Sequence, residues 1–187
     1  SRFVTRCICF DERNYEAGLL EALLCLGRRQ RQRLPLLPAS DKDMDFVSRH
    51  RGALLGFYAF NMPEHETMEM LLNKRRFYEY AAEHDVPIPR TLLPKTPADL
   101  TTWRTRIRYP CIIKPPWRDE AWTTRFGNRK VVVCDDFETL QRQFAEVAGL
   151  FPQCVVQEVV PGPEQNIYCA FALLDAASDI LSRSEEH

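Results

Sequence analysis

The stretch Tyr109-Pro110-Cys111-Ile112-Ile113-Lys114-Pro115-Pro116 sets the pattern from which the fold of this 187-residue chain is predicted. Its apolar centre predicts a short buried strand, and the paired prolines end it because proline cannot donate a hydrogen bond to a sheet ladder. Lys114 ends this strand, so a rigid backbone would hold its compact positive charge in place. We interpret Lys114 as a candidate phosphate ligand. The alternative is a lysine that simply ends the strand in water, since most lysines are exposed.

Before this strand, the sequence predicts an α/β layer. Short apolar runs at 3–10, 34–38 and 54–60 alternate with helical patterns at 14–26 and 41–47, the order expected of a parallel sheet covered by helices. Gly27 is expected to end the first helix. From Pro63 two helices follow in close succession, with Asn73 as the N-cap of the second. An extended segment, Val86–Pro89, and a helix that starts at Thr96 come next.

After the strand, the sequence predicts a mixture of helix and strand. A polar segment at 117–129 separates it from a strand at 130–134, an amphipathic helix at 135–148 and a strand at 155–156. The tripeptide Pro161-Gly162-Pro163 predicts a turn. A hairpin made of 167–174 and 180–181 is expected after it.

Charge and cysteine content exclude several classes of protein. The chain has 25 basic and 26 acidic side chains and a formal charge of −1. It therefore has no net positive electrostatic field that would attract nucleic acid or an anionic membrane. It lacks both an apolar run of about 18 residues and a signal-peptide pattern, so we expect a cytoplasmic protein that does not bind a membrane. The seven cysteines are odd in number and lie mostly in apolar runs. We therefore expect reduced thiols and, without zinc spacing, no metal site.

The basic run Arg28-Arg29-Gln30-Arg31-Gln32-Arg33 is the sharpest change in composition. It allows a nucleic-acid contact as one interpretation. A helix C-terminus favours basic residues in any case, and no aromatic residues interleave the run. We therefore predict no nucleic-acid partner.

A second candidate site is the octapeptide Gln157-Glu158-Val159-Val160-Pro161-Gly162-Pro163-Glu164, which lies between two predicted strands. A chain that crosses between two subdomains leaves a carbonyl and an amide outside any sheet ladder, and a purine edge offers a matching donor and acceptor. Glu164 is placed to accept hydrogen bonds from ribose hydroxyls. An ordinary strand, turn and strand would contain the same residues.

Together these segments resemble the ATP-grasp superfamily, and more closely its carboxylate-amine ligase branch. The resemblance runs from about Leu19 to Leu181 and is most specific at 73–80, 86–91, 109–115 and 157–164. It implies an α/β fold with a partial parallel layer, an α+β nucleotide-binding subdomain and the first strands of a second subdomain. The implied domains are 1–62, 63–157 and 158–187.

The resemblance also implies roles for individual residues. Lys74 and Lys114 match the two lysines that such enzymes turn toward the phosphates of ATP. Glu158 would offer its backbone carbonyl to the exocyclic amine of adenine, and Val160 its backbone amide to the ring. Glu164 would offer its carboxylate to the ribose.

The octapeptide and the phosphate loop depart from the family pattern. Gln157 stands where many relatives have an acid. Many relatives carry a run of glycines where this chain has 117–129 with a single glycine. We expect charge from Arg118, Arg125 or Lys130 to replace the missing backbone donors there.

The magnesium ligands of the family lie well downstream of the octapeptide, so we expect them beyond His187. Phosphoryl transfer depends on metal ions that neutralise developing charge, so we expect this polypeptide alone to be inactive. No catalytic residue is assigned. Our first hypothesis is the ATP-binding portion of an ATP-dependent ligase that joins a carboxylate to an amine through an acyl phosphate. The second is a noncatalytic nucleotide-binding or interaction module with the same architecture.

Overall fold

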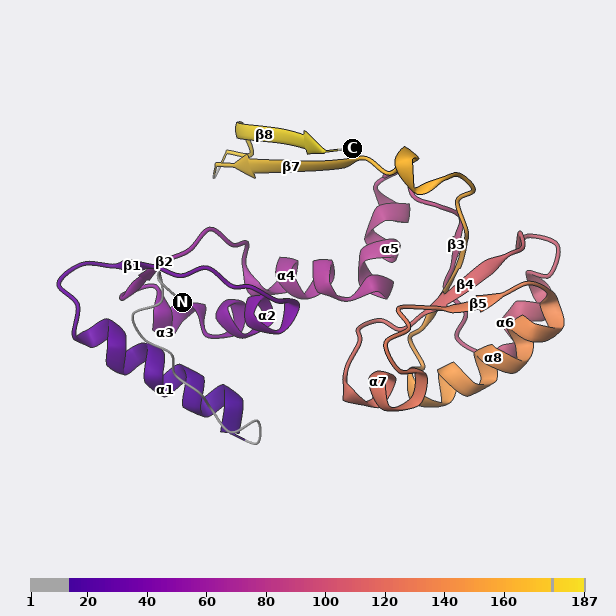
Figure 1. Ribbon diagram of the computed structural model, residues 1–187, viewed down its shortest axis with the longest axis horizontal. Coiled ribbons are helices and arrows are strands. Elements are labelled where there is room, and N and C mark those ends of the chain that lie inside the picture. Colours follow the sequence, from indigo (N-terminus) through magenta and orange to yellow (C-terminus); the bar gives the residue numbers. More distant parts are fainter. Residues whose placement is uncertain (1–13, 176, 187) are drawn as a thin grey trace.

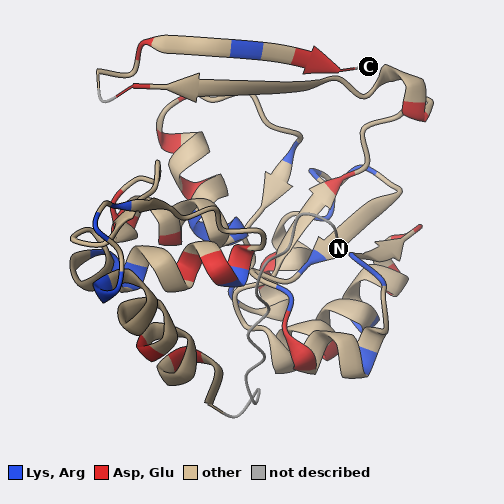
Figure 2. Ribbon diagram, turned by 60° about the vertical axis from the view of Figure 1, so that its left-hand side comes forward, with Lys and Arg blue, Asp and Glu red and all other residues tan. Residues whose placement is uncertain are grey.

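The computed structural model describes residues 14–175 and 177–186. The strand predicted at 3–10, with Cys7 and Cys9, lies outside them. The described chain contains a two-stranded sheet of β1 and β2, a four-stranded sheet in the order β3-β6-β4-β5, and a two-stranded sheet of β7 and β8. Figure 1 shows the first two sheets in separate halves of the molecule, joined through α4 and α5. Acidic and basic residues are spread over all these parts (Figure 2), consistent with a net charge of −1.

The N-terminal half is a small α/β layer, as the sequence predicts. It consists of α1 (Tyr15–Arg28), β1 (Leu34–Pro35), α2 (Asp41–Arg49), α3 (Arg51–Leu54) and β2 (Tyr58–Ala59). β1 and β2 pair in parallel, which confirms the predicted direction. Ser40 caps α2 by accepting a hydrogen bond from the Asp43 amide at 3.2 Å. The strand predicted at 54–60 is shorter than expected, because Leu54 belongs to α3 and packs in the core with Phe46.

The prediction that Gly27 ends the first helix is wrong. α1 continues through Gly27 to Arg28, and Gly27 is buried. A Cβ atom at this position would lie 2.5 Å from the Cβ of Phe57 and 2.9 Å from its Cγ. Gly27 is therefore a point of close approach between α1 and the segment before β2. In the basic run that follows, Arg33 donates hydrogen bonds to the Tyr58 carbonyl at 3.0 and 2.6 Å, which holds β1 beside β2.

Two helices connect the halves, as expected: α4 (His65–Leu72) and α5 (Lys74–Glu83). Asn73 caps α5, since its side-chain oxygen accepts hydrogen bonds from the amides of Arg75 at 3.0 Å and Arg76 at 3.2 Å. The buried guanidinium of Arg75 donates to the carbonyls of Leu93 at 3.0 Å and Pro94 at 3.1 Å. These bonds fix the first turn of α5 against the segment that follows β3.

The second half is an antiparallel sheet with helices on one face. Its strands are β3 (Thr91–Leu92), β4 (Cys111–Lys114), β5 (Val132–Cys134) and β6 (Val155–Glu158), and its helices are α6 (Pro97–Thr102), α7 (Glu120–Phe126) and α8 (Phe137–Leu150). Strand and helix side chains share one core, in which Leu100, Ile113, Trp122, Phe144 and Val156 are at most 1% exposed. The strand predicted around Lys114 and the amphipathic helix predicted at 135–148 are therefore confirmed.

The polar segment at 117–129 contains a helix that the sequence pattern did not predict. Asp119 caps α7 by accepting a hydrogen bond from the Trp122 amide at 3.0 Å. The Trp122 side chain is buried, and its indole N–H donates to the Arg129 carbonyl at 2.6 Å. Half of the expected phosphate loop is thus a helix anchored in the core.

The chain continues through a 3-10 turn (Glu164–Asn166) into the predicted hairpin, β7 (Cys169–Leu174) and β8 (Ile180–Glu186). Gly162 has a φ of 145°, which fits the turn expected at Pro161-Gly162-Pro163, before the hairpin. Within 14–175 and 177–186, no helix has both the length and the apolar character needed to span a bilayer. The domain boundaries at 62/63 and 157/158 stay predictions, although one core cluster lies within 19–62 and the other within 92–156.

Candidate functional site

The face of the four-stranded sheet opposite α6, α7 and α8 carries polar side chains among apolar ones such as Ile112 and Val155. Successive side chains of a strand alternate between the two faces. Cys111 and Ile113 lie in the helix-covered core, so Lys114 projects on the opposite face. On neighbouring strands the same alternation places Gln157 and Thr91, which are register partners, on this second face, which α5 partly covers because Tyr78 reaches Gln157.

A hydrogen-bond network fixes Lys114 on this face. Its ammonium donates to Gln157 Oε1 at 2.6 Å, and the Tyr78 hydroxyl donates to the same oxygen at 3.4 Å. Gln157 Nε2 donates to Thr91 Oγ1 at 2.7 Å, while Thr91 Oγ1 donates to the Pro89 carbonyl at 2.8 Å. Because the single hydroxyl proton of Thr91 goes to Pro89, Thr91 must accept from Gln157. The network therefore orients the amide, and the amide oxygen positions Lys114.

Lys74 comes close to Lys114 through a bond between α5 and the end of β4. The Lys74 amide, one of the first in its helix, donates to the Pro116 carbonyl at 3.0 Å. Burial lowers the pKa of Lys74 below its usual value, Asp41 opposes this shift, and the positive charges of Arg118 and Lys114 reinforce it. Lys74, Lys114 and Arg118 thus form a basic cluster, and an anion bound there would relieve their mutual repulsion.

The three residues expected to replace a glycine-rich loop lie in different surroundings. Arg118 contributes to the basic cluster, through its effect on Lys74. Arg125 forms an ion pair with Glu146 on α8, which ties α7 to the covered side of the sheet. Lys130 is exposed in the connection between α7 and β5. Of the three, only Arg118 has an electrostatic link to Lys74 within the described residues.

At the end of β6, the backbone leaves its ladder. The Glu158 amide donates to the Arg90 carbonyl at 3.0 Å, and the Val159 amide donates to the Pro110 carbonyl at 3.3 Å. Because Val159 bonds to Pro110, the neighbouring register pair of Cys111 and Glu158 exchanges no backbone bonds, and within the described part of the chain no bond outside the ladders reaches the Glu158 carbonyl or the Val160 amide. Val160 is 64% exposed. This segment therefore presents one free acceptor and one free donor, two residues apart.

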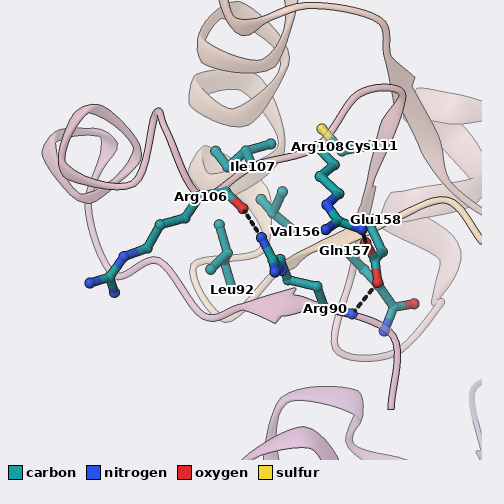
Figure 3. A pocket seen from close by; sticks show the side chains of 9 residues that line it. All are labelled: Arg90, Leu92, Arg106, Ile107, Arg108, Cys111, Val156, Gln157 and Glu158. Carbon is teal, nitrogen blue, oxygen red and sulfur yellow. Dashed lines mark hydrogen bonds and ion pairs between the residues drawn. The ribbon is translucent and has the colours of Figure 1, made fainter.

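The side chains of the octapeptide are arranged differently. Gln157 is buried in the network, and Glu164 is exposed on the 3-10 turn. The Glu158 carboxylate lies on the covered side, beside a small pocket formed by the ends of β3, β4 and β6 and by 106–108 (Figure 3). That pocket has a volume of about 10 Å³, room for a single water molecule. It is therefore too small for a purine.

Sequence reasoning missed two members of the site, Tyr78 and Thr91. Tyr78 lies four residues after Lys74 in one helix, a spacing that puts both on one face, so the signal was present. Thr91 carries no such signal, since its contact with Gln157 joins segments 66 residues apart.

No described residues form a metal centre. Within 14–175 and 177–186, no group of three or more His, Cys, Asp or Glu side chains lies close enough together to hold an ion. The described part of the site thus offers positive charge and backbone groups to a ligand, and no cluster of acidic ligands to magnesium.

The chain has part of an ATP-grasp fold, as its resemblance to that superfamily implied. A solved L-amino acid ligase from Bacillus licheniformis superposes with a TM-score of 0.63 over 96% of this chain and 39% of its own, at 18% identity. The biotin carboxylase domain of a Hydrogenobacter thermophilus 2-oxoglutarate carboxylase, solved with MgADP, ADP and bicarbonate, superposes with a TM-score of 0.63 over 89% and 35%, at 16% identity.

In sequence, the chain is similar to a D-aspartate ligase of Enterococcus faecium (strain Aus0004). The two are 24% identical over 147 residues, which cover 75% of this chain and 35% of that protein. No protein-family model matches the chain. The chain thus spans between 35% and 39% of the length of these relatives.

Proposed function

We propose that the described residues form part of the ATP site of an ATP-dependent ligase that joins a carboxylate to an amine. The observation that carries this proposal is that Lys114 and Lys74 lie near each other at the sheet face opposite α6, α7 and α8, next to backbone groups that lack a ladder partner. Positive charge held on a rigid strand suits phosphates. The similarity to a D-aspartate ligase and an L-amino acid ligase supports the class of reaction.

In this proposal, Lys74 and Lys114 bind phosphate oxygens, and Arg118 adds charge from the segment before α7. The Glu158 carbonyl accepts from the exocyclic amine of adenine, and the Val160 amide donates to the ring. Both backbone groups point away from β4, on the edge of β6 that faces β3.

Three further residues complete the proposed site. Gln157 holds Lys114 in place through its amide oxygen. Glu164 binds the ribose, and Lys130, exposed in the connection after α7, adds positive charge for the phosphates. The intact enzyme would activate its carboxylate as an acyl phosphate, which the amine then attacks.

Magnesium neutralises charge on the transferred phosphoryl group in reactions of this kind. The described residues do not fit it, because they contain no cluster of acidic ligands, and we derive no step through the metal from them. We expect the isolated 187-residue polypeptide to bind ATP without ligase turnover, since it spans only 35% to 39% of the relatives' length. ADP release that depends on a carboxylate and an amine would contradict this expectation.

The second candidate function is a noncatalytic nucleotide-binding module with the same architecture. The absence of a described acidic cluster is compatible with it. The two functions differ in whether the protein, with any further segments its gene encodes, releases ADP when amino acids are supplied.

Isothermal titration calorimetry with Mg-ATP tests nucleotide binding directly. Replacing Lys114 by methionine removes a charged hydrogen-bond donor worth about 1.5–3 kcal/mol, so affinity should fall roughly 10- to 150-fold. Lys95→Met is the matched control, since Lys95 lies before α6 and its amide bonds to Asp99. A parent that shows no binding, or a Lys114→Met variant that binds like the parent, would refute the proposal.

A further inference from the structure

The β3–β6 pairing contains an irregularity at its last position. Thr91 pairs with Gln157 and Leu92 with Val156, so the next partners in this antiparallel register are Arg90 and Glu158. Hydrogen-bonded partners in an antiparallel ladder normally exchange two backbone bonds. Here only one is made between backbones, from the Glu158 amide to the Arg90 carbonyl at 3.0 Å.

The second bond is diverted to a side chain. The Arg90 amide donates to Glu158 Oε1 at 2.8 Å. Glu158 thus uses its carboxylate in place of its own backbone carbonyl to satisfy the partner's amide (Figure 3). The Glu158 side chain is 22% exposed, and its other carboxylate oxygen lies 4.0 Å from a guanidinium nitrogen of Arg108.

Two prolines keep other donors away from the same segment. Pro110 accepts from the Val159 amide but has no N–H with which to return the bond. Pro89, which precedes Arg90, also lacks an N–H. Within the described chain, the Arg90 amide is therefore the donor best placed to occupy the Glu158 carbonyl, and the Glu158 carboxylate holds it.

We infer that the Glu158 side chain is a positioning residue that keeps its own backbone carbonyl available for the base of a bound nucleotide. In an extended chain, residues two apart direct their backbone groups to the same side. The Glu158 carbonyl and the Val160 amide thus form an acceptor and donor pair that suits the 6-amino group and the adjacent ring nitrogen of adenine. The inference rests on the proposed ATP site and adds a source of base selectivity to it.

Without the carboxylate, the Arg90 amide closes the ladder onto the Glu158 carbonyl. The 6-amino group of adenine then competes for an acceptor that is already bonded. A nucleotide with a 6-oxo group in place of the 6-amino group has no donor there for the Glu158 carbonyl, so its affinity does not depend on whether this carbonyl is free. The side chain should therefore affect discrimination between bases more than general affinity for a triphosphate.

The test compares dissociation constants of ATP and inosine triphosphate for the 187-residue chain, Glu158→Ala and Glu158→Gln. In Glu158→Ala, ATP affinity should fall about threefold to tenfold, the range for one net hydrogen bond, while inosine triphosphate affinity changes less than about twofold. Glu158→Gln keeps an acceptor oxygen and should discriminate like the parent. If Glu158→Ala does not fold, Glu158→Asp serves, because its carboxylate is one methylene too short to reach the Arg90 amide.

A double variant separates positioning from general structural damage. Adding Arg90→Pro to Glu158→Ala removes the competing N–H, so preference for ATP should return. Equal losses for both triphosphates in Glu158→Ala, unchanged discrimination, or no recovery in the double variant would overturn the inference. A parent that binds neither triphosphate would refute the proposed ATP site itself, and the inference with it. That result differs from the others because it appears before any substitution is made.

Discussion

Replacing Gln157 by leucine should destabilise the protein through the loss of one network. Gln157 is 4% exposed and joins Lys114 at 2.6 Å to Thr91 at 2.7 Å. A hydrogen bond to a charged group contributes about 1.5–3 kcal/mol and a neutral one about 0.5–1.5 kcal/mol. Water can replace part of the first, because Lys114 is only half-buried, and leucine fills a similar volume. We therefore expect a loss of about 2 kcal/mol in the free energy of unfolding.

Urea denaturation measures this loss. With a slope of about 2 kcal/mol per molar urea, the midpoint should fall by about 1 M. Gln153→Leu is the control, since Gln153 is exposed just before β6. Ordinary surface substitutions change the free energy of unfolding by about 0.5 kcal/mol or less. If the free energies of unfolding of Gln157→Leu and Gln153→Leu differ by no more than that, the network does not hold β6 against β3.

Two further predictions concern Gly27 and Lys74. Gly27→Ala places a Cβ 2.5 Å from the Cβ of Phe57. The resulting overpacking costs about 1–3 kcal/mol, while the gain in helix propensity is about 1 kcal/mol. The midpoint of thermal unfolding should therefore fall. Gly149→Ala in α8 meets no atom within 4 Å and should raise the midpoint instead; the opposite order in calorimetry would contradict the packing. Because the folded pKa of Lys74 lies below its unfolded value, the unfolded chain binds more protons at this side chain between the two, so the contribution of Lys74 to stability should rise with pH toward 10.5. The difference in unfolding free energy between the parent and Lys74→Met, parent minus variant, should therefore rise with pH across this range, and a difference that falls would show the wrong sign.

The elements near Lys114 could be predicted because their signals are local. The apolar run of β4 ends at two prolines, and Asn73 and Thr96 have the spacing of helix caps. The parallel direction of β1 and β2 followed from the alternation of strands and helices. These features depend on residues within a few positions of one another.

Features that depend on distant residues could not be predicted. Gly27 looks like a helix stop until Phe57 is brought against it. α7 has seven residues, too few for its period to stand out from a polar surrounding, and its stability comes from burial of Trp122. Gln157 was identified only through family resemblance, and its contact with Thr91 spans 66 positions.

The diverted bond at Glu158 also lay beyond sequence reasoning. The sequence does not indicate whether the amide of a neighbouring strand will donate to the backbone carbonyl or to the carboxylate of an acidic residue at the end of a strand. Only the register of β3 on β6 shows that Arg90 faces it. The fold and the backbone groups proposed for adenine could thus be expected from the sequence and its family resemblance, while the bond from the Arg90 amide to the Glu158 carboxylate could not.

Amide hydrogen–deuterium exchange with and without Mg-ATP tests most directly whether nucleotide binds on this sheet face. We predict slower exchange at Gln157–Glu164, around Lys74 and across 114–118, with α1 and α2 unchanged. Protection confined to the N-terminal layer, or no protection at nucleotide concentrations that saturate the protein, would contradict this prediction.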